Sequence, residues 1–560
     1  MKNTYLIILL LISNLIFSQN LEIGVGNGKS IVDNNLRLIV CNENITTYNV
    51  SNLSSLNINI SGNNYHFTNI PSGLQYGQPY QVEFNSQTFT LYFSQTALIN
   101  ISTTSVIVDE PKVLANITVT DITNSPPITS YCGIEYRGGI SQSYPKKSYD
   151  IELWGDTTGN TTYKVSVLNM RNDDDWLLLS LYNEPLRLRN VINHKLWREM
   201  HSIYYNSQEP SAVSGVKTEY AELAINNEYL GIYALTEQVD KKQLKLKKYN
   251  GSIRGELYKG VNWNGSRITN LTSYNNNQRV WSGYKMKYPK ESESTDWDNL
   301  YNFFDFVINS SDSNFENNIA NEFEIQNAID YFIFLNFIRA PDNTGKNTYI
   351  AKYKTNEPYY YVPWDLDGTY GILWNGNRAN IFDDILTNGL YTRLLNTNSN
   401  TFYQQASIRW NGLRNNVLDN SIIISNISQT YNYLLSNGIY DREILKWGAN
   451  TIDFSNLNYT YNWINNRFDY LNHYFNPTLS SSNNIYSEEK NISIFPNPIT
   501  STFTINTKST TSYSIYNISG VLVKKGVTKD YKIINIEDFN TGIYFLKVPN
   551  NKTVLKLIKL

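Results

Sequence analysis

Residues 339–367 read RAPDNTGKNTYIAKYKTNEPYYYVPWDLD, and this stretch carries the most chemical information in the chain. It follows an apolar segment, residues 325–338, whose spacing predicts a helix, and it ends in a hydrophobic strand, residues 359–364, followed by acids. A carboxylate beside such a strand is costly unless a cation or a hydrogen-bond donor partners it. The arrangement therefore indicates a functional site.

Three side chains in this stretch, Asp342, Asn347 and Asp365, have the spacing of a phosphoryl-transfer site. Protein kinases place a catalytic aspartate five residues before a metal-binding asparagine, and a second metal-binding aspartate follows a later strand. In such a site Asp342 accepts the proton of the substrate hydroxyl, while Asn347 and Asp365 hold the metal ion. An aspartate and an asparagine that only form turns would give the same spacing in this asparagine-rich chain.

A second segment, residues 136–153, has the composition of a phosphate-binding loop between two strands. It begins YRGGISQSYPKKSYD, so that Gly138 and Gly139 lie in the loop while Lys146 and Lys147 lead the next strand. Backbone N–H groups beside a strand-borne cation suit polyphosphate binding. A β-hairpin with a solvated lysine pair is the alternative.

The composition of the 560-residue chain excludes several functional classes. Lys and Arg total 47 and Asp and Glu total 49, so the formal net charge is −2, and we expect neither a nucleic-acid partner nor an anionic membrane surface. The hydrophobic fraction of 41% excludes a disordered chain. The four histidines lack the close spacing of zinc ligands. The two cysteines, Cys41 and Cys132, could form one bridge or remain two buried thiols.

The first residues, MKNTYLIILLLISNLIFSQN, predict a signal peptide over residues 1–18. Lys2 precedes an apolar run, and the small Ser18 follows it. The run is shorter than the roughly 20 apolar residues of a membrane-spanning helix. We therefore expect an exported mature chain without a transmembrane segment.

The rest of the chain divides by composition into three domains and a linker. We expect a β-sandwich-like domain over residues 19–104, a mixed α+β body over 105–476, a linker over 477–492 and a small β-sandwich over 493–560. The middle body begins with strands and continues with helix patterns, for example at 186–200. A two-lobed enzyme has this order of elements, as do other folds.

The final segment contains ordered motifs: FPNP at 495–498, YSIYNISG at 513–520, GIYFLKV at 542–548 and a lysine-containing last strand. In these motifs it resembles the C-terminal sorting domain of type IX secretion. The resemblance implies the type IX secretion machinery as a partner and a route from the periplasm across the outer membrane. The location it implies is secreted or on the cell surface, whereas an ordinary structural β-domain is the alternative.

The middle body carries a longer series of motifs. They are DEPK at 109–112, RG at 137–138 with PKKSY at 145–149, DWLL at 175–178, LRN at 188–190, ELAINNEYLGIYALTE at 222–237, LYK at 257–259, KYP at 287–289, DNTGKN at 342–347 and PWDLD at 363–367. In this series residues 105–476 resemble the CotH kinase family of spore-coat-protein-H-like atypical protein kinases. The resemblance implies a divergent two-lobed protein-kinase-like fold and the transfer of the terminal phosphate of ATP, with Mg²⁺ or Mn²⁺, to Ser or Thr of proteins.

The resemblance also assigns roles to individual residues. It makes Asp342 the catalytic aspartate and Asp365, with Asn347, the metal-binding group. Lys147, or its neighbour Lys146, is the lysine that steadies the phosphates.

Further residues receive looser roles from the same resemblance. Asp367 becomes a second metal contact or a residue behind the metal ligands, and Tyr359 stacks on the adenine. Glu237 orients the lysine, for which a solvated loop acid is the alternative.

The chain departs from the family in two places. Gly138-Gly139 replaces a glycine followed by serine or threonine, which alters the backbone contacts to phosphate. Insertions at residues 163–172 and 262–277 lengthen loops around the cleft.

A second function class fits the same sequence. A surface adhesin, or a structural surface protein, could use a kinase-like scaffold without catalysis, because exposed aromatic residues are good contact residues for glycans and proteins. The retention of Asp342, Asn347, Asp365 and Lys147 favours the enzyme.

Overall fold

The computed structural model describes residues 19–123, 126–476, 493–506, 510–518, 520–529, 532–548 and 554–560. The chain divides into two compact units, one ending at Phe475 and the other beginning at Asn476. The signal peptide expected over residues 1–18 and the linker expected over 477–492 lie outside the described residues. Among the described helices, none combines the length and the apolar character needed to cross a membrane.

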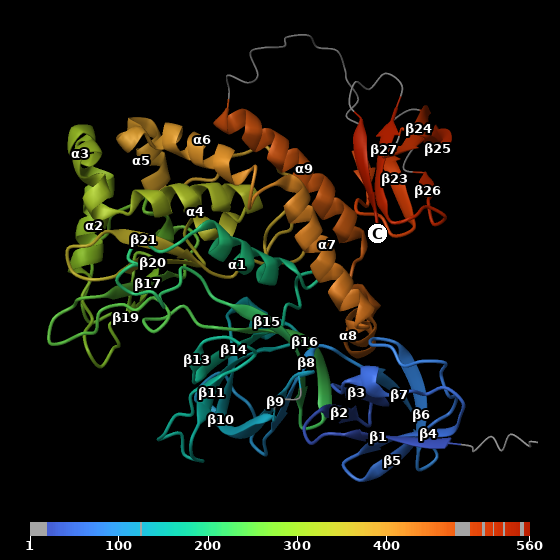
Figure 1. Cartoon of the computed structure of the whole chain (residues 1–560). Coiled ribbons are helices and arrows are strands. Elements are labelled where there is room, and N and C mark those ends of the chain that lie inside the picture. The colour runs from blue at the N-terminus through green and yellow to red at the C-terminus, as the bar shows by residue number, and fades with distance from the viewer. Residues whose placement is uncertain are drawn as a thin grey trace, which may run out of the picture. The chain divides into compact units, whose positions relative to one another are not determined.

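The first unit opens with a seven-stranded sheet of order β1-β4-β5-β6-β7-β3-β2 (Figure 1). Its strands are β1 (Gln19–Val25), β2 (Ser30–Asp33), β3 (Leu38–Cys41), β4 (Leu53–Ile60), β5 (Asn63–Phe67), β6 (Pro79–Phe84) and β7 (Gln87–Phe93). In β4 every second side chain is buried, namely Leu56, Ile58 and Ile60, which is the period of a strand with one face on a core. Cys41 and Cys132 are both free and buried.

A closed barrel follows, with the strand order β10-β11-β14-β16-β15-β8-β9. Its strands are β8 (Ala97–Ser102), β9 (Val113–Thr120), β10 (Ile128–Arg137), β11 (Ser148–Trp154), β14 (Asp175–Leu179), β15 (Thr218–Ile225) and β16 (Glu228–Thr236). Side chains such as Ile99, Ile134 and Trp176 fill its interior, as in other small barrels. Because β8 pairs with both β9 and β15, the barrel continues across position 104, where the sequence suggested a domain boundary.

Beyond the barrel lies a five-stranded sheet of order β18-β19-β17-β20-β21. Its strands are β17 (Glu256–Gly260), β18 (Val280–Trp281), β19 (Tyr284–Tyr288), β20 (Thr348–Lys352) and β21 (Tyr359–Pro363). A separate two-strand ladder pairs β12 (Val165–Ser166) with β13 (Asn172–Asp173).

Some of the helices pack against this sheet, and others pack against the barrel or against one another (Figure 1). They are α1 (Arg189–Met200), α2 (Asp298–Asn309), α3 (Asp312–Glu322), α4 (Ile325–Ile338), α5 (Gly389–Thr397), α6 (Phe402–Leu413), α7 (Asn420–Ser436), α8 (Ile439–Trp447) and α9 (Ser455–Phe475). Helix α4 packs against β21, α6 and α9, and it is buried on nearly all sides, as expected for a helix that is apolar all round. The segment that begins at Arg339 follows directly after α4.

The second unit consists of two small antiparallel sheets. One joins β22 (Ser493–Phe495), β23 (Thr502–Asn506) and β26 (Ile533–Asn535), and the other joins β24 (Thr511–Asn517), β25 (Leu522–Thr528), β27 (Gly542–Lys547) and β28 (Leu555–Lys559). Phe503, Ile515 and Leu546 lie in their common core. The chain thus mixes helices with several sheets, as the sequence predicts.

Candidate active site

A cavity of about 740 Å³ in the first unit collects most of the predicted site residues. The barrel contributes Arg137, Gly138 and Gly139 from the end of β10 and the loop after it. The five-stranded sheet contributes Lys259, Lys285 and Lys287, and the loops around the β20–β21 hairpin contribute Asp342, Lys346, Asn347, Trp364, Asp365 and Asp367.

The β20–β21 hairpin explains why distant acids meet. Thr348 faces Pro363 across the two strands, so the residues just before β20 and just after β21 lie at the same end of the hairpin. There Asn347 Nδ2 donates a hydrogen bond of 3.1 Å to Asp365 Oδ2, and the Trp364 N–H donates one of 3.0 Å to the Asn347 carbonyl. The hairpin register therefore places Asn347 beside Asp365.

Asn343, which the sequence reasoning did not single out, fixes the loop that carries Asp342. Its Nδ2 donates to the carbonyls of Asn347 at 2.8 Å and Trp364 at 2.7 Å, which ties the loop to both ends of the hairpin. Asn347 and Asp365 themselves have φ angles of +60° and +56°. Non-glycine residues in this left-handed region are uncommon and cluster at functional sites.

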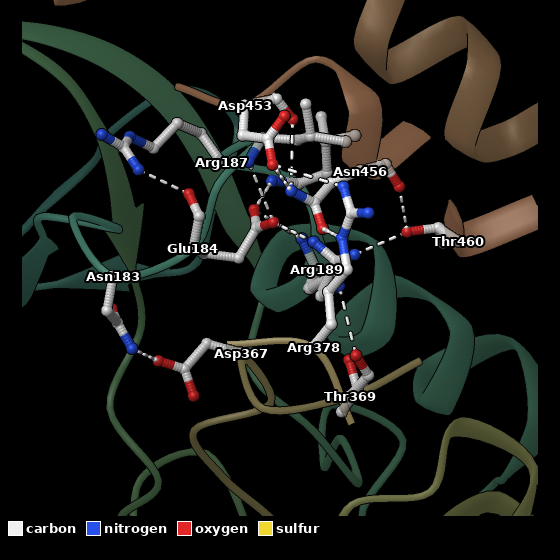
Figure 2. A network of polar contacts seen from close by, with 12 residues as sticks. Asn183, Glu184, Arg187, Arg189, Asp367, Thr369, Arg378, Asp453, Asn456 and Thr460 are labelled. Atoms are coloured by element: carbon white, nitrogen blue, oxygen red, sulfur yellow. Dashed lines mark hydrogen bonds and ion pairs between the residues drawn. The ribbon is translucent and has the colours of Figure 1, made fainter. Parts of the chain in front are cut away.

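Two carboxyl groups of the cavity, those of Asp342 and Asp367, lie in an environment that disfavours their charge. Removal from water raises the pKa of Asp342, with Lys346 opposing this effect and Asp365 adding to it. Removal from water and the neighbouring Asp365 raise the pKa of Asp367 to about 8. Asn183 Nδ2 donates to Asp367 at 2.6 Å, as Figure 2 shows. Asp342, Asp365, Asp367 and Asn347 line the same cavity and carry carboxylate and amide oxygens, the donor type that Mg²⁺ and Mn²⁺ prefer, although the three carboxylates are not gathered into one tight cluster among the described residues.

A group of cations lines the same cavity. Partial burial, with Arg137 nearby, lowers the pKa of Lys259 to about 8, and Lys287 and Lys285 act in the same direction against the attraction of Asp365. The Arg137 guanidinium lies 5.6 Å from the Trp364 ring centre, and Lys259 Nζ lies 5.9 Å from a Trp364 ring centre. Clustered cations that lower one another's pKa favour a bound anion.

Gly138 shapes the loop at the barrel side of the cavity. Its φ is +100°, a backbone conformation that favours glycine, and a Cβ at this position would lie 1.9 Å from Ser141 Oγ and force that hydroxyl to move. Gln142 Nε2 closes the loop by donating to the Gly138 carbonyl at 2.8 Å. Gly138 and Gly139 both line the cavity, as a phosphate-binding loop would.

The two lysines of the following strand take up other positions. Lys146 is fully buried, and its Nζ donates to Glu443 Oε1 at 2.7 Å and to the Ile232 carbonyl at 2.6 Å. The Lys147 ammonium donates to the carbonyl of Gln142. Lys259 lines the cavity, whereas the sequence suggested Lys147 or Lys146 for this place. Lys259 belongs to the LYK motif at 257–259, which gave the only sequence signal for it.

Glu237 and Tyr359 also have contacts away from the cavity wall. The carboxylate of Glu237 accepts the N–H of Arg171 at 3.0 Å and of Lys217 at 2.9 Å, so it stabilises two chain segments beside the barrel. Tyr359 is fully buried in β21, where its hydroxyl donates to Glu256 at 2.6 Å. A buried ring in this position does not fit the adenine-stacking role, because its neighbours already enclose it.

Behind Asp367, a buried polar network holds the start of α1 (Figure 2). Arg189 pairs with Glu184, donates to Thr460 Oγ1 at 2.6 Å and donates to the Thr369 carbonyl at 3.2 Å. The network connects the segment that bears Asn183 to α9. It is structural, since its charges are paired with each other.

A separate acid cluster, Asp173, Asp174 and Asp175, lies outside the cavity lining. Lys242 Nζ contacts all three carboxylates, at 3.0 Å from Asp174 and 2.6 Å from Asp175, and Arg171 adds a contact of 2.6 Å to Asp173. These two cations offset part of the negative charge of the three carboxylates.

Two family models match parts of the chain. A comparison with curated proteins found no match. The family model for the secretion system C-terminal sorting domain matches residues 493–559, so the second unit is such a domain and the protein is exported. The family model for CotH kinase protein matches residues 134–474, more than half of the chain, and includes every wall of the cavity. The chain belongs to the CotH kinase family.

Proposed function

We propose that this protein is an exported kinase that transfers the terminal phosphate of ATP to Ser or Thr of secreted or surface proteins. The observation that carries this proposal is the composition of the cavity wall. Arg137, Lys259, Lys285 and Lys287 line it together with Asp342, Asp365 and Asp367. A polyphosphate needs the cations, and a divalent cation needs the carboxylates.

Asp365, Asn347 and Asp367 are the residues that would hold Mg²⁺ or Mn²⁺. When bound, the metal ion neutralises charge on the phosphate oxygens of the nucleotide. The high pKa of Asp367 supports this assignment, because a carboxylate enclosed beside other carboxylates gains most from a cation.

Asp342 acts as the base toward the acceptor hydroxyl. The hydroxyl oxygen forms a bond to the γ-phosphorus, the bond from that phosphorus to its bridging oxygen breaks, and ADP leaves. The hydroxyl proton passes to the Asp342 carboxylate, whose raised pKa makes it a better base. Lys259 and Arg137 hold the phosphates in position.

Two features of the architecture belong to the same proposal. The barrel and the five-stranded sheet with its helices would act as the two lobes of a divergent protein-kinase-like fold, one on each side of the cavity. The seven-stranded sheet and the second unit would be sandwich-like accessory domains.

Phosphate transfer provides the direct test. The full chain is incubated with ATP labelled at the γ-phosphate, with Mg²⁺ or Mn²⁺ and an extract of secreted proteins, beside Asp342→Asn and Asp365→Asn. Asp383→Asn is the matched control, because Asp383 is an exposed acid outside the cavity lining. We expect label with the unchanged chain and the control only. Equal label in all four chains, or in none, would favour a surface adhesin or structural protein on a kinase-like scaffold.

The export route is proposed on the sorting domain and on the signal peptide expected over residues 1–18. Deletion of residues 493–560 should leave the protein in the periplasm, as shown by cell fractionation. Normal surface display of the shortened chain would refute the sorting role.

A further inference from the structure

The insertion at residues 262–277 builds a second groove beside the catalytic cavity. This groove has a volume of about 560 Å³ and lies between the insertion and the residues around β18. Val261 lines both the groove and the catalytic cavity, so the two spaces adjoin. Residues that the family resemblance leaves without a role therefore shape a surface that adjoins the cavity at Val261.

Specific contacts hold the insertion in place. Ser266 Oγ donates to the Gly283 carbonyl at 2.6 Å, and the buried Tyr284 donates from its hydroxyl to the Ser266 carbonyl at 2.7 Å. Gly283 has φ +78°, and a Cβ there would lie 2.7 Å from the Ser266 nitrogen, so only glycine allows this approach. Farther along, Trp281 Nε1 donates to the Thr272 carbonyl at 3.2 Å. These hydrogen bonds hold the backbone of the insertion in place around the groove.

The chemistry of the groove differs from that of the cavity. All of its lining residues are uncharged, and Asn264, Thr269, Asn270 and Ser282 present amides and hydroxyls. Such groups both donate and accept hydrogen bonds, as a peptide backbone requires. The groove also borders β18, the outermost strand of its sheet, and strand edges bind extended peptides.

We propose that this groove binds the acceptor polypeptide of the kinase as an extended, uncharged segment. The segment pairs through its backbone with the amides and hydroxyls of the groove, and its Ser or Thr side chain extends past Val261 to Asp342. The inference rests on the proposed function and adds where the protein substrate binds. Phosphates remain at the cations of the cavity, so nucleotide and acceptor occupy separate surfaces.

The test fills the groove without touching the cavity. Asn270→Trp places a large side chain in the groove, and Asn317→Trp on the exposed face of α3 is the matched control. The full chain and both variants are assayed on a synthetic peptide library with one central serine and randomised flanks. Asn270→Trp should lower kcat/KM for the library at least tenfold through a higher KM, with KM for ATP unchanged within twofold. Asn317→Trp should match the unchanged chain in both constants.

Direct binding of the same library, with Mn²⁺ and a non-hydrolysable ATP analogue, separates the two proposals. If no chain transfers phosphate, the proposed kinase function fails. The groove is then still a peptide-binding site if peptides bind the Asp365→Asn chain and do not bind the Asn270→Trp chain. Peptide turnover or binding that is equal in Asn270→Trp and the unchanged chain overturns the groove assignment. Binding of oligosaccharides in place of peptides, or an equal rise in KM for ATP, overturns it as well.

Discussion

Lys259 and Lys147 differ in what surrounds their ammonium groups, and this difference is testable. Lys259 lies on the cavity wall with Arg137, whereas Lys147 donates to the Gln142 carbonyl. Lys259→Met should weaken ATP binding by about tenfold to a hundredfold, the usual effect of losing a charge-assisted contact to phosphate. Lys147→Met should change it less than threefold. Titration with a fluorescent ATP analogue measures both, and a larger loss with Lys147→Met would restore the sequence-based assignment.

The residues of the site that could be predicted from the sequence are those joined by local structure. Asp342, Asn347 and Asp365 lie in one loop-and-hairpin segment, so their spacing alone indicates that they can meet. Lys259 comes from a different strand, and its position depends on how that strand pairs within the sheet. The spacing of residues along the sequence does not show which strands β17 pairs with. For this reason Lys147 was predicted as the phosphate-binding lysine in place of Lys259.

His194 gives the protein a pH dependence of stability that can be assigned to one side chain. It is fully buried beside Trp364, and burial, with Arg198 nearby, lowers its pKa to about 3. In the unfolded chain its pKa is about 6.5, so between these values the unfolded state binds more protons and stability falls as the pH falls. Lowering the pH from 7 to 5 should cost about 2 kcal/mol through this residue.

The His194→Leu variant checks that assignment. Leucine is uncharged and similar in size, and neither ring nitrogen of His194 has a hydrogen-bond partner among the described residues. In urea unfolding at pH 7 and pH 5, the variant should lose about 2 kcal/mol less than the unchanged chain on acidification. The same loss in both chains would show that His194 does not control it.

At the scale of elements, α8 is fastened to the barrel by buried ion pairs. Glu443 of α8 accepts from Lys146, from Arg187 at 3.2 Å and from the Ile232 N–H at 2.7 Å, and its side chain is fully buried. Lys146 lies just before β11, at the end of the loop that contains Gly138 and Gly139. The helix therefore supports the loop that lines the cavity.

Glu443→Gln should be strongly destabilising. Two buried cations lose their counter-charge, and breaking such a pair on one side typically costs about 3–5 kcal/mol. Glu228 of β16 is an exposed partner of Lys446, which lies on α8 like Glu443. Glu228→Gln should therefore lower the free energy of unfolding by less than about 1 kcal/mol. Urea denaturation of the two variants measures the difference. Equal midpoints would contradict the role assigned to Glu443.

Single elements were predictable where their periodicity is strong. The apolar pattern at 325–338 coincides with α4, while the helix expected at 186–200 begins at Arg189. Glu184 explains the later start, because its carboxylate accepts the Leu188 N–H and pairs with Arg189, which holds the preceding turn. The apolar spacing of residues 186–200 cannot reveal this start, because Glu184 lies before that segment.

At the scale of the whole molecule, the seven-stranded sheet and the barrel share a core. Leu98 of β8 packs with Val40 of β3 and Tyr229 of β16, although composition alone suggested a boundary near residue 104. Composition cannot locate this boundary, since β8 resembles the strands before it and pairs with strands far along the chain. The closed barrel thus depends on residues that precede the match to the CotH family model.

A shortened chain tests this dependence. A chain of residues 105–476 lacks β8, so β9 and β15 lose their common partner, and its thermal midpoint should fall well below that of residues 19–476. Scanning calorimetry should show a broad, weak transition for the shorter chain. A sharp transition at the same midpoint would mean that the barrel closes without β8. The chain of residues 19–476 should match the full protein, because residues from 476 form a separate compact unit.

The central claim is that the cavity binds a metal–nucleotide complex, and titration calorimetry of the full chain with ATP tests it most directly. With Mg²⁺ or Mn²⁺ we predict one ATP per chain, at least tenfold weaker binding without the metal ion, and at least tenfold weaker binding in Asp365→Asn. The Asp383→Asn chain should bind like the unchanged chain. Binding that is absent with both metal ions, or is equally tight without metal and in Asp365→Asn, would contradict the claim.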